Sequence, residues 1–223
     1  MPFIPLEHKD HPGIHLGMWK AEENEKYFLD RLNIYENEQE ILNSISHPLK
    51  RLEWLSSRLC LKELLKINYK VESLNENTGK PYLSDRSHHI SYSHSNLFAG
   101  AIASHDIPVA IDLEDRSKKR NPRTRFLFMH PSELEFYEEL GDHRLFFLIW
   151  SSKETLYKMW ANKGLIFKEN LLINRERNPL EDFGTVSGII EKDDFKKEYT
   201  IYYHFFSDVL LTYTVDPDGM RRE

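Results

Sequence analysis

The chain has 223 residues, of which 40% are hydrophobic and 30% charged, and this composition is typical of a globular protein with a sizeable core. The net charge of −6 disfavours general nucleic-acid binding, and the sequence has neither a signal peptide pattern nor an apolar run long enough to cross a membrane. Cys60 is the only cysteine, which excludes an internal disulfide and fits the reducing cytosol.

The first half of the chain is predicted to place helices before strands. A strand is expected at 14–19 and one or two helices within 21–46. After the break at His47-Pro48, leucines at near-helical spacing predict a strong amphipathic helix over 49–67. A turn at 77–79 and a strand–turn–strand unit over 90–103 follow.

The second half begins with a strand at 107–114, followed by a polar, basic loop or helix start at 115–125. Pro131 predicts the first position of a helix. A second strong helix is expected over 145–160, interrupted at Ser151-Ser152. Three further strands are predicted at 185–190, 199–206 and 209–215.

The two long helices show a faint internal echo. Trp54, Ser56 and Lys62 recur as the same residue types 96 positions later, and each helix precedes a β-rich stretch. We therefore predict an α+β fold with two similar halves, at 1–106 and 107–223, and a ligand cleft between them.

Three carboxylates and one lysine are the residues with the clearest chemical meaning. The alternation in Val109-Ala110-Ile111-Asp112-Leu113-Glu114 predicts a half-buried strand with Asp112 and Glu114 on one face, roughly 7 Å apart. Glu154 and Lys158 lie one turn apart on a helix that would begin at a serine cap. A third carboxylate beside the strand pair would form an oxygen-only site for Mg²⁺ and a phosphate. The alternative is a set of ordinary surface acids and a helical Glu–Lys pair.

Two further short segments carry candidate phosphate ligands. Lys80 stands between a flexible glycine and a rigid proline, which would direct its side chain, and His94 stands between Ser93 and Ser95. A solvated lysine and a structural histidine are the alternatives. A basic run over 116–125 could steer an acidic partner to this region or could be a solvated loop.

Four blocks in order resemble the Sfp-type 4′-phosphopantetheinyl transferases. They are Gly79-Lys80-Pro81, Ile90-Ser91-Tyr92-Ser93-His94-Ser95, the acid-bearing strand at 109–114, and Trp150-Ser151-Ser152-Lys153-Glu154-Thr155-Leu156-Tyr157-Lys158. Two positions depart from the family pattern, which usually has Gly at Ala110 and often has Asn at Ser91.

The resemblance implies a pseudo-dimer of two α+β halves within one chain, for which a monomer would be sufficient. It also implies a Mg²⁺-dependent enzyme that moves phosphopantetheine from coenzyme A to a serine of a carrier protein and releases 3′,5′-ADP. The rival hypotheses are another Mg²⁺-dependent nucleotide or phosphate-ester enzyme, and a carrier-binding protein with a degenerate site.

The resemblance also implies roles for individual residues. Asp112, Glu114 and Glu154 would bind Mg²⁺, with Glu154 or a metal-bound water as general base, and Lys158 would contact the departing phosphate. Coenzyme A would contact Lys80, Ser93 and His94, with Lys50, Arg51 and Arg58 as further candidates for its 3′-phosphate. A Glu133–Lys153 pair would fix the catalytic helix. Carrier docking would fall to Lys118, Lys119, Arg120, Arg123 and Arg125.

Overall fold

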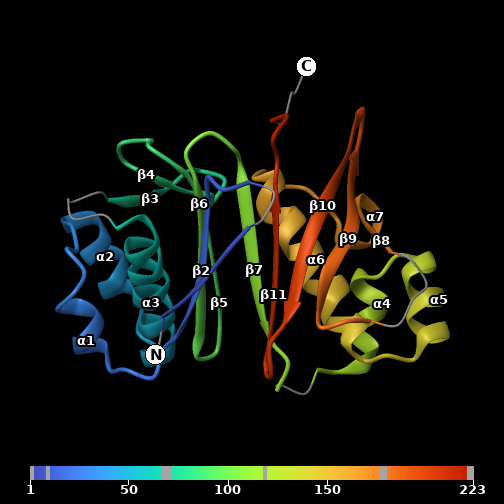
Figure 1. Ribbon diagram of the computed structural model, residues 1–223, viewed down its shortest axis with the longest axis horizontal. Coiled ribbons are helices and arrows are strands. Elements are labelled where there is room, and N and C mark those ends of the chain that lie inside the picture. The colour runs from blue at the N-terminus through green and yellow to red at the C-terminus, as the bar shows by residue number, and fades with distance from the viewer. Residues whose placement is uncertain (1–2, 9–10, 67–71, 118–119, 176–179, 220–223) are drawn as a thin grey trace.

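The computed structural model describes residues 3–8, 11–66, 72–117, 120–175 and 180–219. Two antiparallel sheets pack against each other at the centre, and helices cover the outer face of each sheet (Figure 1). The fold class is therefore α+β in two halves, as predicted. Within the described segments, no helix is long and apolar enough to cross a membrane.

The first half contains a six-stranded sheet in the order β1-β2-β6-β5-β4-β3. Helix α3 packs on its β2, β5 and β6 strands, and α1 packs on α3. The elements are β1 (Phe3–Leu6), β2 (Ile14–Lys20), α1 (Glu25–Leu29), α2 (Glu36–Ser44), α3 (Pro48–Leu65), β3 (Ser73–Asn75), β4 (Pro81–Leu83), β5 (His89–Ser95) and β6 (Phe98–Ser104).

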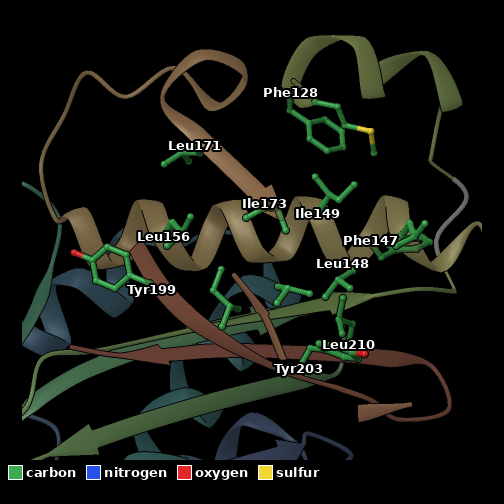
Figure 2. Packing of buried hydrophobic residues seen from close by; sticks show 14 of the residues in the cluster. Phe128, Phe147, Leu148, Ile149, Leu156, Leu171, Ile173, Tyr199, Tyr203 and Leu210 are labelled. Carbon is green, nitrogen blue, oxygen red and sulfur yellow. The ribbon is translucent and has the colours of Figure 1, made fainter. Parts of the chain in front are cut away.

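The second half contains a five-stranded sheet in the order β7-β11-β10-β9-β8, with α6 across one face. Its elements are β7 (Val109–Asp115), a 3₁₀ turn η1 (Pro122–Thr124), α4 (Arg125–Phe128), α5 (Pro131–Leu140), α6 (Arg144–Trp160), α7 (Phe167–Asn170), β8 (Leu171–Asn174), β9 (Phe183–Lys192), β10 (Phe195–Phe205) and β11 (Val209–Val215). Figure 2 shows Leu148 and Leu156 of α6 packed among Tyr199, Tyr203 and Leu210 of this sheet.

Two details of the second half differ from the sequence prediction. Helix α6 is continuous through Ser151 and Ser152, which are both fully buried, so the predicted interruption and serine cap are wrong. Strand β7 is buried along its whole length instead of being half-buried. The apolar face of β7 packs on the first sheet, and α6 covers the face that carries the acids.

The backbone N–H groups on the unpaired edge of β7 donate hydrogen bonds to serine hydroxyls of β5. The backbone N–H groups of residues 111, 113 and 115 donate to the hydroxyls of Ser91, Ser93 and Ser95 at 3.3, 2.9 and 2.9 Å. The period-two spacing of the serines matches the strand repeat, so each hydroxyl meets every second N–H group. Gly100 of β6 permits this close approach, because a Cβ there would lie 2.9 Å from Leu113. The two halves are thus joined by hydrogen bonds directly beside the acid-bearing strand.

Each half also contains a buried glutamate in the first turn of a helix, α2 in the first half and α5 in the second. In α2, Glu38 accepts from the N–H of Tyr35, which precedes the helix, and from the N–H of Ser73 in β3. In α5, Glu133 accepts in the same way from the N–H of His130 and the N–H of Ile173 in β8. Arg58 of the long helix α3 faces Glu38, and Lys153 of the long helix α6 faces Glu133. The two halves therefore share the same arrangement of a buried glutamate and a cation.

Candidate active site

Asp112 of β7 lies at the centre of the site and is 6% exposed. One carboxylate oxygen, Oδ1, accepts from Lys158 Nζ at 2.8 Å and from Ser93 Oγ at 3.0 Å. The other, Oδ2, accepts from Ser151 Oγ at 2.7 Å. Strands β5 and β7 and helix α6 therefore meet at this one carboxylate.

Glu114 and Glu154 approach the same region from β7 and α6. Glu114 is 5% exposed and pairs with Arg120. Burial raises the pKa of Glu154 to about 7, and the negative charge of Asp112 adds to this shift, as does that of Glu114, while Lys158 and Arg120 oppose it. The three predicted carboxylates therefore interact electrostatically, although Asp112 and Glu154 are distant in the sequence.

This donor set fits a hard divalent cation. Carboxylate oxygens are the ligands that Mg²⁺ prefers, and a cation would relieve the repulsion that raises the Glu154 pKa. In the structure, Lys158 pairs with Asp112 and Arg120 pairs with Glu114, so these two cations supply the positive charge at the site. Within the described part of the chain, no three His, Cys, Asp or Glu side chains are placed so that they could hold a metal ion. Binding of a metal would thus require these side chains to rearrange.

Lys158 also borders a cavity of about 270 Å³ between the halves. In addition to Asp112, its Nζ donates to the backbone oxygen of Ile111 at 3.0 Å and to Ser93 Oγ at 3.1 Å. The Gly79-Lys80-Pro81 turn and Tyr92 line the cavity from the first half, and Tyr157 and Asn162 line it from the second. The two predicted lysines therefore meet at one cavity.

His94 lies on β5 beside the beginning of α3. Its Nδ1 is 3.3 Å from Glu53 Oε2, and the same glutamate oxygen is 2.6 Å from Lys50 Nζ. Burial lowers the pKa of His94. The positive charges of Lys50 and Lys158 lower this pKa further, whereas the negative charge of Glu53 raises it. The His94 side chain remains 40% exposed and is accessible to a ligand.

The two candidate arginines of α3 have structural partners and do not line this cavity. Arg51 pairs with Glu25 at 2.6 Å and donates to backbone oxygens at the end of α2. Arg58 has a 10% exposed side chain that stacks on the Trp54 ring, with its guanidinium carbon 3.6 Å from the ring centroid.

Lys153 pairs with Glu133 in the core beneath the site. Lys153 Nζ lies 2.7 Å from Glu133 Oε2, and the two side chains are 0% and 1% exposed. Lys153 also donates to the backbone oxygens of Phe128 and Phe167, at 2.8 and 3.0 Å. Because Lys153 immediately precedes Glu154, this pair restrains the part of α6 that carries the acid.

The predicted basic run is only partly engaged in internal contacts. Arg120 contacts Glu114, and Arg125 donates to the backbone oxygen of Pro122 and lies over the Phe126 ring. Arg123 is exposed. Lys118 and Lys119 lie outside the described residues.

Sequence reasoning missed the hydroxyl groups around Asp112. Ser151 contacts Thr212 of β11, and Thr212 contacts Thr155. The spacing of Ser151 and Thr155, one helical turn apart, was the available signal. Their burial depends on β11, whose residue 212 pairs with residue 112 in the sheet, and the sequence does not reveal that register.

Comparison with known families gives one match, in the second half of the chain. A family model described as the 4′-phosphopantetheinyl transferase superfamily matches residues 108–213, which include the acid-bearing strand and α6. No curated protein matches the chain. The family match supports phosphopantetheinyl transferase activity in general. Over these residues the match supports the family predicted from the sequence.

Proposed function

We propose that the chain transfers 4′-phosphopantetheine from coenzyme A to a serine of an acyl or peptidyl carrier protein and releases 3′,5′-ADP. The observation that carries this proposal is the convergence of Asp112, Glu114 and Glu154 beside Lys158, at the edge of a cavity lined by both halves. One chain contains both sides of the site, divided near Asp106, so a monomer would be sufficient. The free, buried thiol of Cys60 supports a reducing compartment such as the cytosol.

The reaction forms a bond between the carrier serine oxygen and the β-phosphorus of coenzyme A and breaks the bond to the bridging oxygen of the diphosphate. The serine proton goes to Glu154, which acts as the general base. Lys158 neutralises the charge that develops on the departing 3′,5′-ADP. Lys80, Ser93 and His94 orient the donor from the first half, while Arg51 and Arg58 contribute indirectly through α3.

Mg²⁺ would be held by Asp112, Glu114 and Glu154. When bound, it would offset the charge of the diphosphate and polarise the phosphorus. Arg120 and Lys158 would then exchange their carboxylate contacts for contacts with phosphate or solvent. Glu133 and Lys153 would keep α6 in place during this exchange.

Carrier docking is proposed at the loop and short helix that follow β7. Arg120, Arg123 and Arg125 lie in this segment with the exposed side chains of Phe126 and Leu127, and Lys118 and Lys119 belong to the same run. Carrier proteins are acidic near the modified serine, so a basic surface with apolar side chains is complementary to them. Raised salt should increase the KM for the carrier more than the KM for coenzyme A, and an equal effect on both would exclude docking here.

The deciding experiment is intact-mass analysis of several apo carrier proteins after incubation with the chain, coenzyme A and Mg²⁺. A mass gain of one phosphopantetheinyl group on the carrier supports the proposal. Release of 3′,5′-ADP without a carrier would instead indicate a hydrolase. Coenzyme A binding without either reaction would indicate a degenerate carrier-binding protein.

A further inference from the structure

A chain of buried hydroxyl groups lies behind Asp112, on the side away from Lys158. Ser151 Oγ is 2.7 Å from Asp112 Oδ2 and 2.8 Å from Thr212 Oγ1, and Thr212 Oγ1 is 2.7 Å from Thr155 Oγ1. Ser151, Thr212 and Thr155 are all 0% exposed. These hydrogen-bonded hydroxyl groups thus connect α6 and β11 to the carboxylate without access to solvent.

The direction of these hydrogen bonds follows from the chemistry of the groups. An ionised carboxylate can only accept, so the single proton of Ser151 is directed to Asp112. Ser151 Oγ can then only accept from Thr212, whose single hydroxyl proton is shared between Ser151 Oγ and the Ser151 backbone oxygen, to which Thr212 Oγ1 also donates at 3.0 Å. Thr212 in turn accepts from Thr155. All three hydroxyls therefore donate towards Asp112, and aligned hydrogen bonds in a low-dielectric interior strengthen one another.

We propose that Ser151, Thr212 and Thr155 are positioning residues that fix Asp112 Oδ2, so that Oδ1 faces the substrate side of the site. This inference rests on the proposed function. Oδ1 is the oxygen bound by Lys158 and Ser93 at the junction of the halves. Because Oδ2 is already held, a metal or Lys158 meets a carboxylate of defined orientation. Outer hydrogen bonds of this kind typically change metal affinity by 10-fold or more when removed.

The chain offers matched controls for two of the hydroxyls. Ser152 is adjacent to Ser151 and equally buried, yet its hydroxyl has no hydrogen-bond partner among the described residues. Thr214 lies on the same strand as Thr212 and is also 0% exposed, but its hydroxyl donates to the backbone oxygen of Thr200 at 2.7 Å. Ser152→Ala and Thr214→Val therefore repeat the chemical change without touching the chain to Asp112.

The test measures Mn²⁺ binding by electron paramagnetic resonance with coenzyme A present and no carrier, so that no turnover occurs. Ser151→Ala should weaken Mn²⁺ binding about tenfold, and Thr212→Val somewhat less, whereas Ser152→Ala and Thr214→Val should bind like the wild type. Thr155→Val should have the smallest effect of the three, and Thr212→Ser should restore binding. Melting temperatures then show whether each variant is as stable as its matched control.

Equal Mn²⁺ affinity in Ser151→Ala and Ser152→Ala, with the wild type binding Mn²⁺ and modifying a carrier, would overturn this inference and leave the proposed function intact. If Ser151→Ala fails to fold, the comparison of Thr212→Val with Thr214→Val decides the question in the same way. A wild-type chain that neither binds Mn²⁺ nor modifies any carrier would refute the proposed function, and this inference with it.

Discussion

The two halves anchor their long helices with the same arrangement but at different strength. Glu38 and Glu133 each accept from the N–H that precedes their helix and from an N–H of a distant strand. In the first half the facing cation, Arg58, lies 4.0 Å from the carboxylate and stacks on Trp54. In the second half Lys153 lies 2.7 Å from Glu133.

The difference coincides with where the chemistry is proposed. The tighter pair lies directly next to Glu154, and the looser one supports a helix that contributes packing and, through Glu53, a contact to His94. We infer that the same arrangement of glutamate and cation occurs in both halves. Only in the second half is the ion pair short, and there it lies next to the charged site.

The largest effect is expected at Glu154. Glu154→Gln removes a proposed metal ligand and base, so the transfer rate should fall at least about 10³-fold. Because neighbouring acids and burial raise the Glu154 pKa, a neutral side chain should not lower the melting temperature. Glu63→Gln, an exposed acid on α3, is the control and should leave the rate unchanged. A Glu154→Gln variant with full activity would remove Glu154 from the proposed chemistry.

The next effect concerns the stability of the second half. Glu133→Gln leaves the charge of Lys153 buried without its partner, which should lower the free energy of unfolding by about 3 kcal/mol. Urea unfolding followed by circular dichroism measures this change. Transfer activity should fall as well, because α6 would be less restrained near Glu154. An unchanged midpoint and unchanged activity would show that the pair does not fix the helix.

The corresponding change in the first half should have a smaller effect. Glu38→Gln weakens two hydrogen bonds to a charged acceptor, while Arg58 keeps its stacking on Trp54, so a loss of about 1 to 2 kcal/mol is expected. The same urea experiment compares it with Glu133→Gln. A loss equal to that of Glu133→Gln, or greater, would mean that the two anchors do not differ in strength.

The smallest effect concerns the acid–arginine pairs near the beginning of each long helix. The hydrogen bond from Arg51 lowers the pKa of Glu25, and Arg144 contributes to a lowered pKa of Asp142. A lowered folded-state pKa stabilises the fold above the unfolded value, and this contribution is lost as the pH falls through the folded value.

Glu25→Gln and Asp142→Asn should therefore each destabilise the chain at pH 7, by less than about 1 kcal/mol because both pairs are partly exposed. The deficit should be smaller at pH 3, which lies below the unfolded-state pKa of both carboxyl groups. Urea midpoints at the two pH values measure it, and a deficit that grows on acidification would contradict the assignment.

The sequence predicted the elements whose pattern is local. The alternation in β7 and the leucine spacing of α3 gave those elements within one or two residues, and the strand predicted at 209–215 is β11. The two-half α+β plan is confirmed. Ser151 and Ser152 were read as a helix break because serine favours caps. Within α6, packing on β11 overrides that preference, and Asp112 supplies the Ser151 hydroxyl with a partner.

The remaining features depend on contacts between distant residues. Glu38 was not singled out, because its partners Ser73 and Arg58 follow only from the fold. The Glu133–Lys153 pair was expected from the family resemblance and not from its spacing. The pairs Glu38–Arg58 and Glu133–Lys153 also relate the two halves to each other. The sequence offset between these pairs is one residue shorter than the 96-residue offset of the repeated Trp, Ser and Lys.

Phosphopantetheine transfer through the acids of β7 and α6 is the central proposal for this protein. The measurement that tests it is the intact mass of an apo carrier protein incubated with coenzyme A, Mg²⁺ and either the wild-type chain or Asp112→Ala. We predict a gain of one phosphopantetheinyl group with the wild type and an unmodified carrier with the folded variant. An equal gain with both proteins would contradict the assigned site, and no gain on any carrier with the folded wild type would contradict the function.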